Sequence, residues 1–195
     1  GDLSNDRDSV IALAEQIVAQ DPAIDLLVNN AGGYFDVPFL EMDFEIFEKT
    51  MRLNVGAYFL LTQFFARRWV SQNTPGRVLM IGSINGRLAE DTHVAYDTSK
   101  GAVEMMVRSV CVELAPHGIR VNGLAPGLFR TPLTAPALDD PKLDNWMKLH
   151  TPNGSVPGPE VAADAAVFLL SDAAKHIHGQ MLLVDGGMSV WQQPS

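Results

Sequence analysis

The sequence predicts an α/β protein in which helices cover a mostly parallel sheet. Short, nearly continuous apolar runs alternate along the chain with longer segments whose apolar residues recur at helical spacing. Polar residues come directly after several of these runs, where ligands bind in such sheets. Since 195 residues are enough to bury one sizeable core, we expect a single domain over 1–195 with right-handed crossovers.

The first half of the chain is predicted to hold two helices and two strands. Apolar residues at helical spacing indicate a helix over 10–18, which an Asp-Pro pair ends. The apolar run 24–28 is typical of a buried parallel strand. A longer helical pattern covers 43–71, and a Pro-Gly turn separates it from a strand predicted at 78–81.

The second half begins with a helix that runs to about residue 115, where Pro-His-Gly breaks it. A strand follows at 119–124, and the segment 131–159 is then rich in proline. Within that segment, Asp140-Pro141 indicates the N-cap and first turn of a short helix. A final helix starts where the segment ends, and a final strand is predicted at 180–184.

Composition excludes several classes of protein. Apolar residues make up 47% of the chain and charged residues 19%, as in globular proteins. The net charge of -9 argues against a nucleic-acid or anionic-membrane surface. No apolar stretch is long enough to span a bilayer, and the first residues do not resemble a signal peptide. The single cysteine, Cys111, suits a reducing cytoplasm, and its place on an apolar stripe predicts packing in the core.

Tyr96 and Lys100 are the candidate catalytic pair. Their i,i+4 spacing on a helix places phenol and ammonium on one face. A nearby cation favours the phenolate and lowers the tyrosine pKa toward the working pH, where proton transfer is most efficient. Ser83, just after the strand at 78–81, would orient a substrate oxygen. Such a pair is also common by chance, and an exposed tyrosine beside a solvated lysine is the plain alternative.

Other motifs at fixed distances favour the chemical interpretation. Asn29-Asn30-Ala31-Gly32 closes one apolar run, Asn54 lies inside a helical stretch, and Pro126-Gly127 closes another run. With Ser83 and Tyr-x-x-x-Lys, this series resembles the short-chain dehydrogenase/reductase family over essentially the whole chain. The resemblance implies a Rossmann-like, doubly wound parallel sheet with helices on both faces. It also implies an enzyme that interconverts a secondary alcohol and a ketone with NAD or NADP.

The resemblance further implies roles for the polar residues. Tyr96 donates a proton to a carbonyl in reduction, or takes one from an alcohol in oxidation. Lys100 lowers the pKa of Tyr96 and hydrogen-bonds the nicotinamide ribose. Ser83, with Asn85 beside it, contacts the substrate. Asn54 holds, through its backbone carbonyl, a water that links the lysine to solvent; its plain alternative is a helix-interior packing residue.

Cofactor binding is implied for further positions. Asp2-Leu3 matches the family's adenine contact, and a loop after Pro126 matches the part that holds the nicotinamide carboxamide. The family usually has Val or Ile where Phe129 stands. The full set of cofactor-binding positions is Asp2, Leu3, Asn29, Ala31, Gly32, Tyr96, Lys100, Pro126, Gly127, Phe129 and Thr131.

A family feature is missing from this sequence. The Gly-rich turn that meets a dinucleotide's pyrophosphate is absent, since neither Gly32-Gly33 nor Gly186-Gly187 has its spacing. We expect an N-terminally incomplete member that lacks the first βαβα units, and weak cofactor binding by the 195-residue chain alone. The residue that would select NAD or NADP lies in the missing part, so both cofactors stay open. The alternative is a catalytically inactive, truncated paralogue that acts only as an interaction or structural subunit.

The remaining expectations concern substrate, assembly and metals. The segment 132–158 would form a lid over the substrate, because loops this long are usually functional. Gly86-Arg87 and the lid loosely resemble sugar-acid, glucose and 3-oxoacyl reductases. Family members are commonly tetramers, so a homo-oligomer, dimer or tetramer, is implied. His176-Ile177-His178 lacks a third ligand at helical spacing, so we expect exposed loop histidines and no metal.

Overall fold

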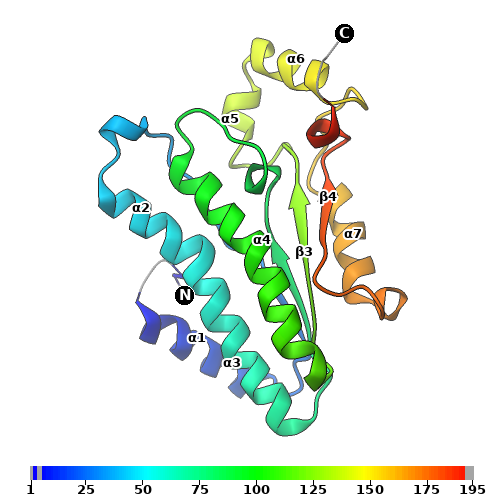
Figure 1. Cartoon of the computed structure of the whole chain (residues 1–195). Helices are drawn as coiled ribbons and strands as arrows, with labels where there is room; N and C mark the ends of the chain where they lie inside the picture. The colour runs from blue at the N-terminus through cyan, green and yellow to red at the C-terminus, as the bar shows by residue number, and fades with distance from the viewer. Residues whose placement is uncertain (1, 4–5, 192–195) are drawn as a thin grey trace.

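The computed structural model describes residues 2–3 and 6–191. Over this part of the chain, strands and helices alternate as the sequence predicts (Figure 1). Four strands of the described residues form one sheet in the order β1-β2-β3-β4, and every neighbouring pair is parallel. The strands are β1 (Leu26–Asn29), β2 (Arg77–Ile81), β3 (Arg120–Pro126) and β4 (Met181–Val184).

Helices lie on both faces of this sheet because its strands are apolar on both sides. In β2, Val78 and Met80 point into a core shared with α1, α3 and α4, whereas Leu79 packs with Leu169 of α7 on the opposite face. Figure 1 shows α3 and α4 in front of the sheet and α7 at its other side. The helices are α1 (Arg7–Gln20), α2 (Phe44–Met51), α3 (Ala57–Gln72), α4 (Val94–Leu114), α5 (Ala135–Leu138), α6 (Pro141–His150) and α7 (Glu160–Leu170).

One crossover departs from the expected handedness. The connections β2–β3 and β3–β4 step across the sheet in the same direction, but α4 and α7 lie on opposite faces. Two such connections must have opposite hands, so one of them is left-handed, against the strong preference for right-handed units. The long segment with α5 and α6 lets the chain pass beyond the strand ends to the other face before α7 begins.

The long helix predicted over 43–71 is interrupted. Between α2 and α3 the backbone forms a π-helical turn at Arg52–Gly56, and Asn54 lies in its middle with no exposed surface. An inserted π-turn rotates the following helix relative to the preceding one. The apolar periodicity continues across the turn, so the sequence pattern does not reveal it.

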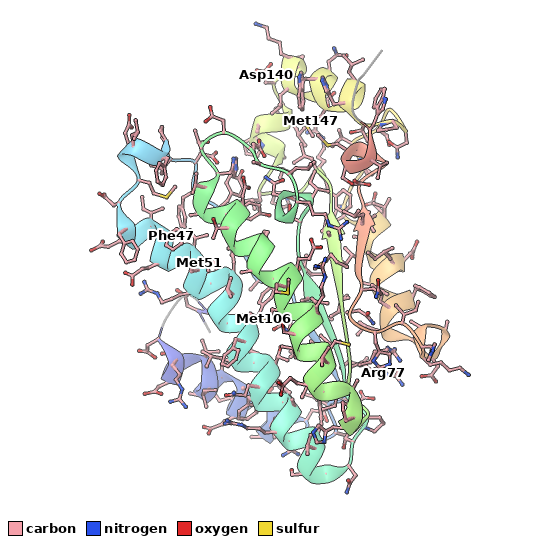
Figure 2. The ribbon with its side chains drawn as sticks, in the orientation of Figure 1. Phe47, Met51, Arg77, Met106, Asp140 and Met147 are labelled. Carbon is pink, nitrogen blue, oxygen red and sulfur yellow. The ribbon has the colours of Figure 1, made fainter. Side chains whose placement is uncertain are left out.

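The proline-rich segment after β3 contains two short helices. Asp140 caps α6 as predicted, since its carboxylate accepts a hydrogen bond of 2.9 Å from the backbone N–H of Lys142. Figure 2 places Asp140 and Met147 on α6, beyond the carboxyl ends of β3 and β4. Arg130 holds this segment together, because its guanidinium contacts the Asp139 carboxylate at 2.9 Å and the Leu138 carbonyl at 3.0 Å.

The described helices and the first strand have two further features that concern the surface of the molecule. Within the described residues, none of the helices combines the length and apolarity that a bilayer crossing requires. Leu26 and Val28 of β1 are 43% and 46% exposed on the sheet face that α7 covers further along.

Cys111 is buried in the α4 core as predicted, and burial raises the pKa of its thiol.

Candidate active site

The carboxyl ends of three strands bring the predicted polar residues to one edge of the sheet. β1 ends at Asn29 beside Met80, and β2 ends at Ile81 beside Leu124 of β3. The chain then turns at Gly32, Ser83 and Gly127. Parallel strands place these turns side by side, as expected for a ligand site in an open α/β sheet.

Tyr96 and Ser83 meet at this edge. Tyr96 lies in the first turn of α4, and Ser83 caps the short 3-10 turn that follows β2. The Ser83 side chain hydrogen-bonds the phenol, which lowers the pKa of Tyr96, but desolvation of the half-buried residue has the larger effect and raises that pKa above its ordinary value. The phenol is therefore protonated and held by a neighbouring hydroxyl.

Lys100 lies one turn further along α4 and is 4% exposed. Its ammonium donates a 3.0 Å hydrogen bond to the carbonyl of Ile81, and its Nζ lies 5.5 Å from the ring centre of Tyr96. Burial lowers the pKa of Lys100 to about 8. Tyrosine and lysine thus share one helix face, as the spacing predicts.

The expected lowering of the Tyr96 pKa by Lys100 is not found. Desolvation dominates, and the nearby acidic groups Asp97 and Glu90 also raise the pKa of the phenol. The ammonium is directed to a backbone carbonyl of β2 instead. Sequence spacing fixes the shared face of the two side chains, but it does not determine how deeply each is buried.

Asn54 connects the site's elements from the π-turn. Its side-chain oxygen accepts a 3.0 Å hydrogen bond from Gly33 N–H, and its Nδ2 donates to the Gly33 carbonyl at 2.9 Å and to Ser99 Oγ at 2.9 Å. The residue therefore ties the turn after β1 to α4. The water-binding role that the resemblance implies concerns its backbone carbonyl and stays a prediction.

Asn85 belongs to the loop that leads into α4. Its amide donates to the Asp97 carboxylate at 2.9 Å and to the Glu90 carboxylate at 3.3 Å. Asp97 also accepts a 2.9 Å bond from the Glu90 N–H. Asn85 thus lies near Tyr96 as expected, with its amide engaged in fixing the loop, and its role in substrate binding stays a prediction.

The positions predicted near the adenosine part form the sheet edge around β1. Asn29 is 2% exposed and donates to Thr62 Oγ1 at 3.0 Å, which links β1 to α3, while its own side-chain oxygen is buried without a partner. A Cβ at Gly32 would lie 3.3 Å from the Asn54 oxygen and 3.6 Å from Lys100 Nζ. Ala31 is half-buried, Asp2 is exposed, and Leu3 packs against the core.

The positions predicted near the nicotinamide follow β3. Gly127 lies so close to β4 that an added Cβ would be 2.9 Å from Cα of Asp185, which explains glycine after Pro126. Phe129 is 8% exposed. The Thr131 hydroxyl lies 3.1 Å from Thr134 Oγ1, so it helps to begin α5. These residues occupy the edge next to Ser83, and their cofactor contacts stay predictions.

Sequence reasoning missed three residues that contact this site. The rings of Tyr34 and His93 lie 5.9 Å and 6.0 Å from the ring of Tyr96, and Asp36 pairs with His93. His93 could have been found, because it precedes Tyr96 by three positions and so shares its helix face. Tyr34 could not, since it lies on an irregular segment whose path no pattern predicts.

His178, expected on an exposed loop, is half-buried instead, with Nδ1 buried and unpartnered.

Comparison with known proteins gives consistent relatives. The family model described as enoyl-(acyl carrier protein) reductase matches residues 2–189. The 5-keto-D-gluconate 5-reductase of Escherichia coli K12 is 39% identical over 184 residues, which cover 94% of this chain and 72% of that protein.

Solved structures resemble the whole fold. A gluconate 5-dehydrogenase from Burkholderia cenocepacia, in complex with NADP and tartrate, superimposes with a TM-score of 0.93 at 34% identity and covers 98% of this chain and 74% of its own. A 4-hydroxyisoleucine dehydrogenase complexed with NADH gives a TM-score of 0.90 at 28% identity, covering 98% of this chain and 80% of its own.

Proposed function

Because this chain belongs to the short-chain dehydrogenase/reductase family, we propose that it is an NAD(P)-dependent oxidoreductase that interconverts a secondary alcohol and a ketone. The observation that carries this proposal is the half-buried Tyr96, hydrogen-bonded to Ser83, with Lys100 on the same helix face. Two of the three relatives named above, the 5-keto-D-gluconate 5-reductase and the gluconate 5-dehydrogenase, are named for sugar acids, which makes a polyhydroxylated sugar or sugar acid the proposed substrate class. The alternative of an inactive structural paralogue is not favoured, since these relatives are dehydrogenases and reductases.

The chain's own residues supply the proton chemistry. In reduction, Tyr96 Oη gives its proton to the carbonyl oxygen as that oxygen gains negative charge, and in oxidation it accepts the proton back. The Ser83 hydroxyl holds the same oxygen in reach of the phenol. The raised pKa of Tyr96 keeps the proton on the phenol, so the residue is ready to act as the acid when a ketone is reduced.

The residues present fit the reacting end of a nicotinamide cofactor, which would supply or accept the hydride. At Gly32 a side chain would fill the space beside Asn54 and Lys100, so glycine leaves this turn open to a ligand. The buried ammonium of Lys100 would donate a hydrogen bond to the cofactor's ribose. The loop from Pro126 to Thr131 would hold the cofactor's carboxamide. Relatives bind NADP or NADH, and either cofactor is proposed here.

We further propose that residues 132–158, with α5 and α6, form the substrate lid of this single domain. The segment stands beyond the carboxyl ends of β3 and β4, next to the proposed site. Arg130 supports this proposal, because it binds Asp139 and Leu138 and so fixes the segment's base near Gly127.

A homo-oligomer is also proposed, built through α3 and α4. A groove of about 470 Å³ runs between these helices, lined among others by Phe59, Val70 and Val110. Phe59 is 47% and Met105 55% exposed on the same helices, and a second copy would bury both.

The reduced Cys111 fits a cytoplasmic location.

The first prediction tests the proposed acid. Protein expressed from the complete reading frame should convert 5-keto-D-gluconate with NADPH or NADH, followed by the absorbance of the reduced nicotinamide. Tyr96→Phe keeps the ring but removes the proton, so kcat should fall by at least about 100-fold while the protein stays folded. Tyr34→Phe, which changes a tyrosine at the rim, is the matched control and should keep most of its activity. Full turnover in Tyr96→Phe would remove the phenol from the mechanism.

A further inference from the structure

The ring of Tyr96 is packed against two other rings. Tyr34 lies 5.9 Å away with an interplanar angle of 68°, and His93 lies 6.0 Å away at 67°. Tyr34 and His93 are themselves 5.4 Å apart. Edge-to-face contacts of this kind are directional and fix the orientation of the rings. The Lys100 ammonium, 5.5 Å from the ring centre, adds a third neighbour.

His93 is held by an acceptor at each ring nitrogen. Its Nε2 lies 2.9 Å from the Asp36 carboxylate, and its Nδ1 lies 3.0 Å from the backbone carbonyl of Asp91. A neutral imidazole donates from one nitrogen, whereas an imidazolium donates from both. Both ring nitrogens therefore have a polar partner, with the His93 side chain 14% exposed and Asp36 57% exposed.

The backbone of both segments reinforces this contact. The Val37 N–H donates to the Thr92 carbonyl at 3.2 Å, next to the Asp36–His93 pair. Thr92 has a φ of 66°, a left-handed conformation that costs energy for a β-branched residue. Strained residues persist where surrounding contacts fix them, and they cluster at functional sites. The chain thus adopts an unfavourable conformation next to the residue that meets the segment after β1.

Provided that the proposed function holds, we propose that Asp36 and His93 form a positioning pair for Tyr96. The pair fastens the segment after β1 to the start of α4, and its imidazole fixes the phenol ring in the orientation that proton transfer needs. Reacting groups that are displaced by about 1 Å can lose as much as about 100-fold in rate, so a modest rotation of the ring suffices.

Other charged groups around His93 lie on the loop before α4. The Glu90 carboxylate lies 3.9 Å from Nδ1 of His93. The Asp97 carboxylate accepts hydrogen bonds from the Asn85 amide and from the Glu90 N–H. Asp36 is the acidic group that the segment after β1 contributes. Loss of the Asp36 carboxylate would therefore detach His93 from that segment and loosen the ring of Tyr96.

The second prediction concerns kinetics of protein from the complete reading frame. Asp36→Asn and His93→Phe should each lower kcat about tenfold with an unchanged KM for the cofactor. The double variant should lose no more than the worse single one, because both remove the same contact. His93→Gln, which keeps a donor toward Asp36, should recover most of the activity. Asp172→Asn, which breaks the exposed pair with Arg77, is the control and should change nothing.

A second readout needs no turnover. Nitration of tyrosines by tetranitromethane, resolved by peptide mass spectrometry, reports the freedom and accessibility of each ring. Tyr96 should react at least about threefold faster in Asp36→Asn than in the unchanged protein, whereas the buried Tyr58 should stay protected in both. Unchanged nitration together with unchanged kcat would overturn the positioning role. If no substrate is turned over, the proposed function fails while the nitration rates still decide the contact.

Discussion

Lys100 illustrates how a single side chain can cost stability where it serves function. Its ammonium is 4% exposed, and desolvation lowers its pKa from 10.5 to about 8. A shift of this size corresponds to a penalty of about 3 kcal/mol on the charged form. The Ile81 carbonyl that it contacts also receives the Tyr58 hydroxyl at 3.3 Å, so it would keep a donor without the lysine.

The third prediction is that Lys100→Met stabilises the protein and inactivates it. Methionine fills similar space without a charge, so the free energy of unfolding at neutral pH should rise by about 1–3 kcal/mol. Urea unfolding measures the stability, and the ketone assay above measures the activity. Lys142→Met, at an exposed position of α6, is the control and should change neither by much. A less stable Lys100→Met protein would contradict the penalty.

The same pKa shift gives stability a pH dependence with a definite sign. Between about 8 and 10.5, the unfolded chain binds a proton at Lys100 that the folded protein does not, so stability rises with pH in that window. Below about 8 both states are protonated and the penalty is complete. Above pH ~10 the buried Tyr58 and the half-buried Tyr96 oppose the rise, because their raised pKa values keep them protonated only when folded. Lys100→Met should lose the rise.

At the scale of elements, the π-turn between α2 and α3 is the feature that shapes the site. It directs Asn54 at the turn after β1 and at α4 together, through three hydrogen bonds. An uninterrupted α-helix would keep its backbone hydrogen bonds but rotate the side chains after the turn. The sequence prediction placed Asn54 within a helix and missed this rotation, because apolar periodicity does not distinguish one π-turn from regular α-helix.

The fourth prediction follows from these contacts. Asn54→Ala removes a fully buried amide and leaves the half-buried N–H and C=O of Gly33 and the buried Ser99 hydroxyl without this partner, so the free energy of unfolding should fall by about 2–4 kcal/mol. Asn85→Ala removes the same group from a half-buried loop where water can replace it, and should cost less than about 1 kcal/mol. Chemical denaturation of both variants measures the difference. Equal losses would mean that Asn54 is not the structural link between β1 and α4.

At the scale of the whole molecule, the sheet edge at β1 leaves apolar side chains exposed. Leu26 and Val28 are 43% and 46% exposed on an edge strand, although Leu79 beside Val28 in the sheet is fully buried. Exposed apolar edges of sheets are sites of association between chains.

The fifth prediction is that this edge drives association of the 195-residue chain. The double variant Leu26→Thr/Val28→Thr places β-branched side chains, which suit a strand, at both positions and removes apolar surface, so light scattering and binding of a hydrophobic dye should decrease. Val190→Thr, at a position that is 82% exposed and outside the sheet, serves as the control. If the double variant associates as much as the unchanged chain, the surface that drives association lies elsewhere. The groove between α3 and α4 would then be the next site to test.

Much of this molecule follows from local pattern. The alternation of strands and helices, the cap at Asp140, the burial of Cys111 and the shared helix face of Tyr96 and Lys100 were all predicted from the sequence and are found in the structure. Each depends on neighbours within a few positions along the chain, where spacing fixes geometry. Motif spacing also identified the family.

Only the tertiary structure decided the properties that depend on distant segments. It placed α7 opposite α4 and thereby reversed the hand of one crossover. It desolvated the half-buried Tyr96 enough to raise its pKa, where spacing alone predicted a decrease. It also brought Asp36 from the segment after β1 to His93 before α4, 57 positions apart by number (93 − 36). Burial and long-range contacts depend on the whole packed arrangement, so no local stretch of sequence encodes them.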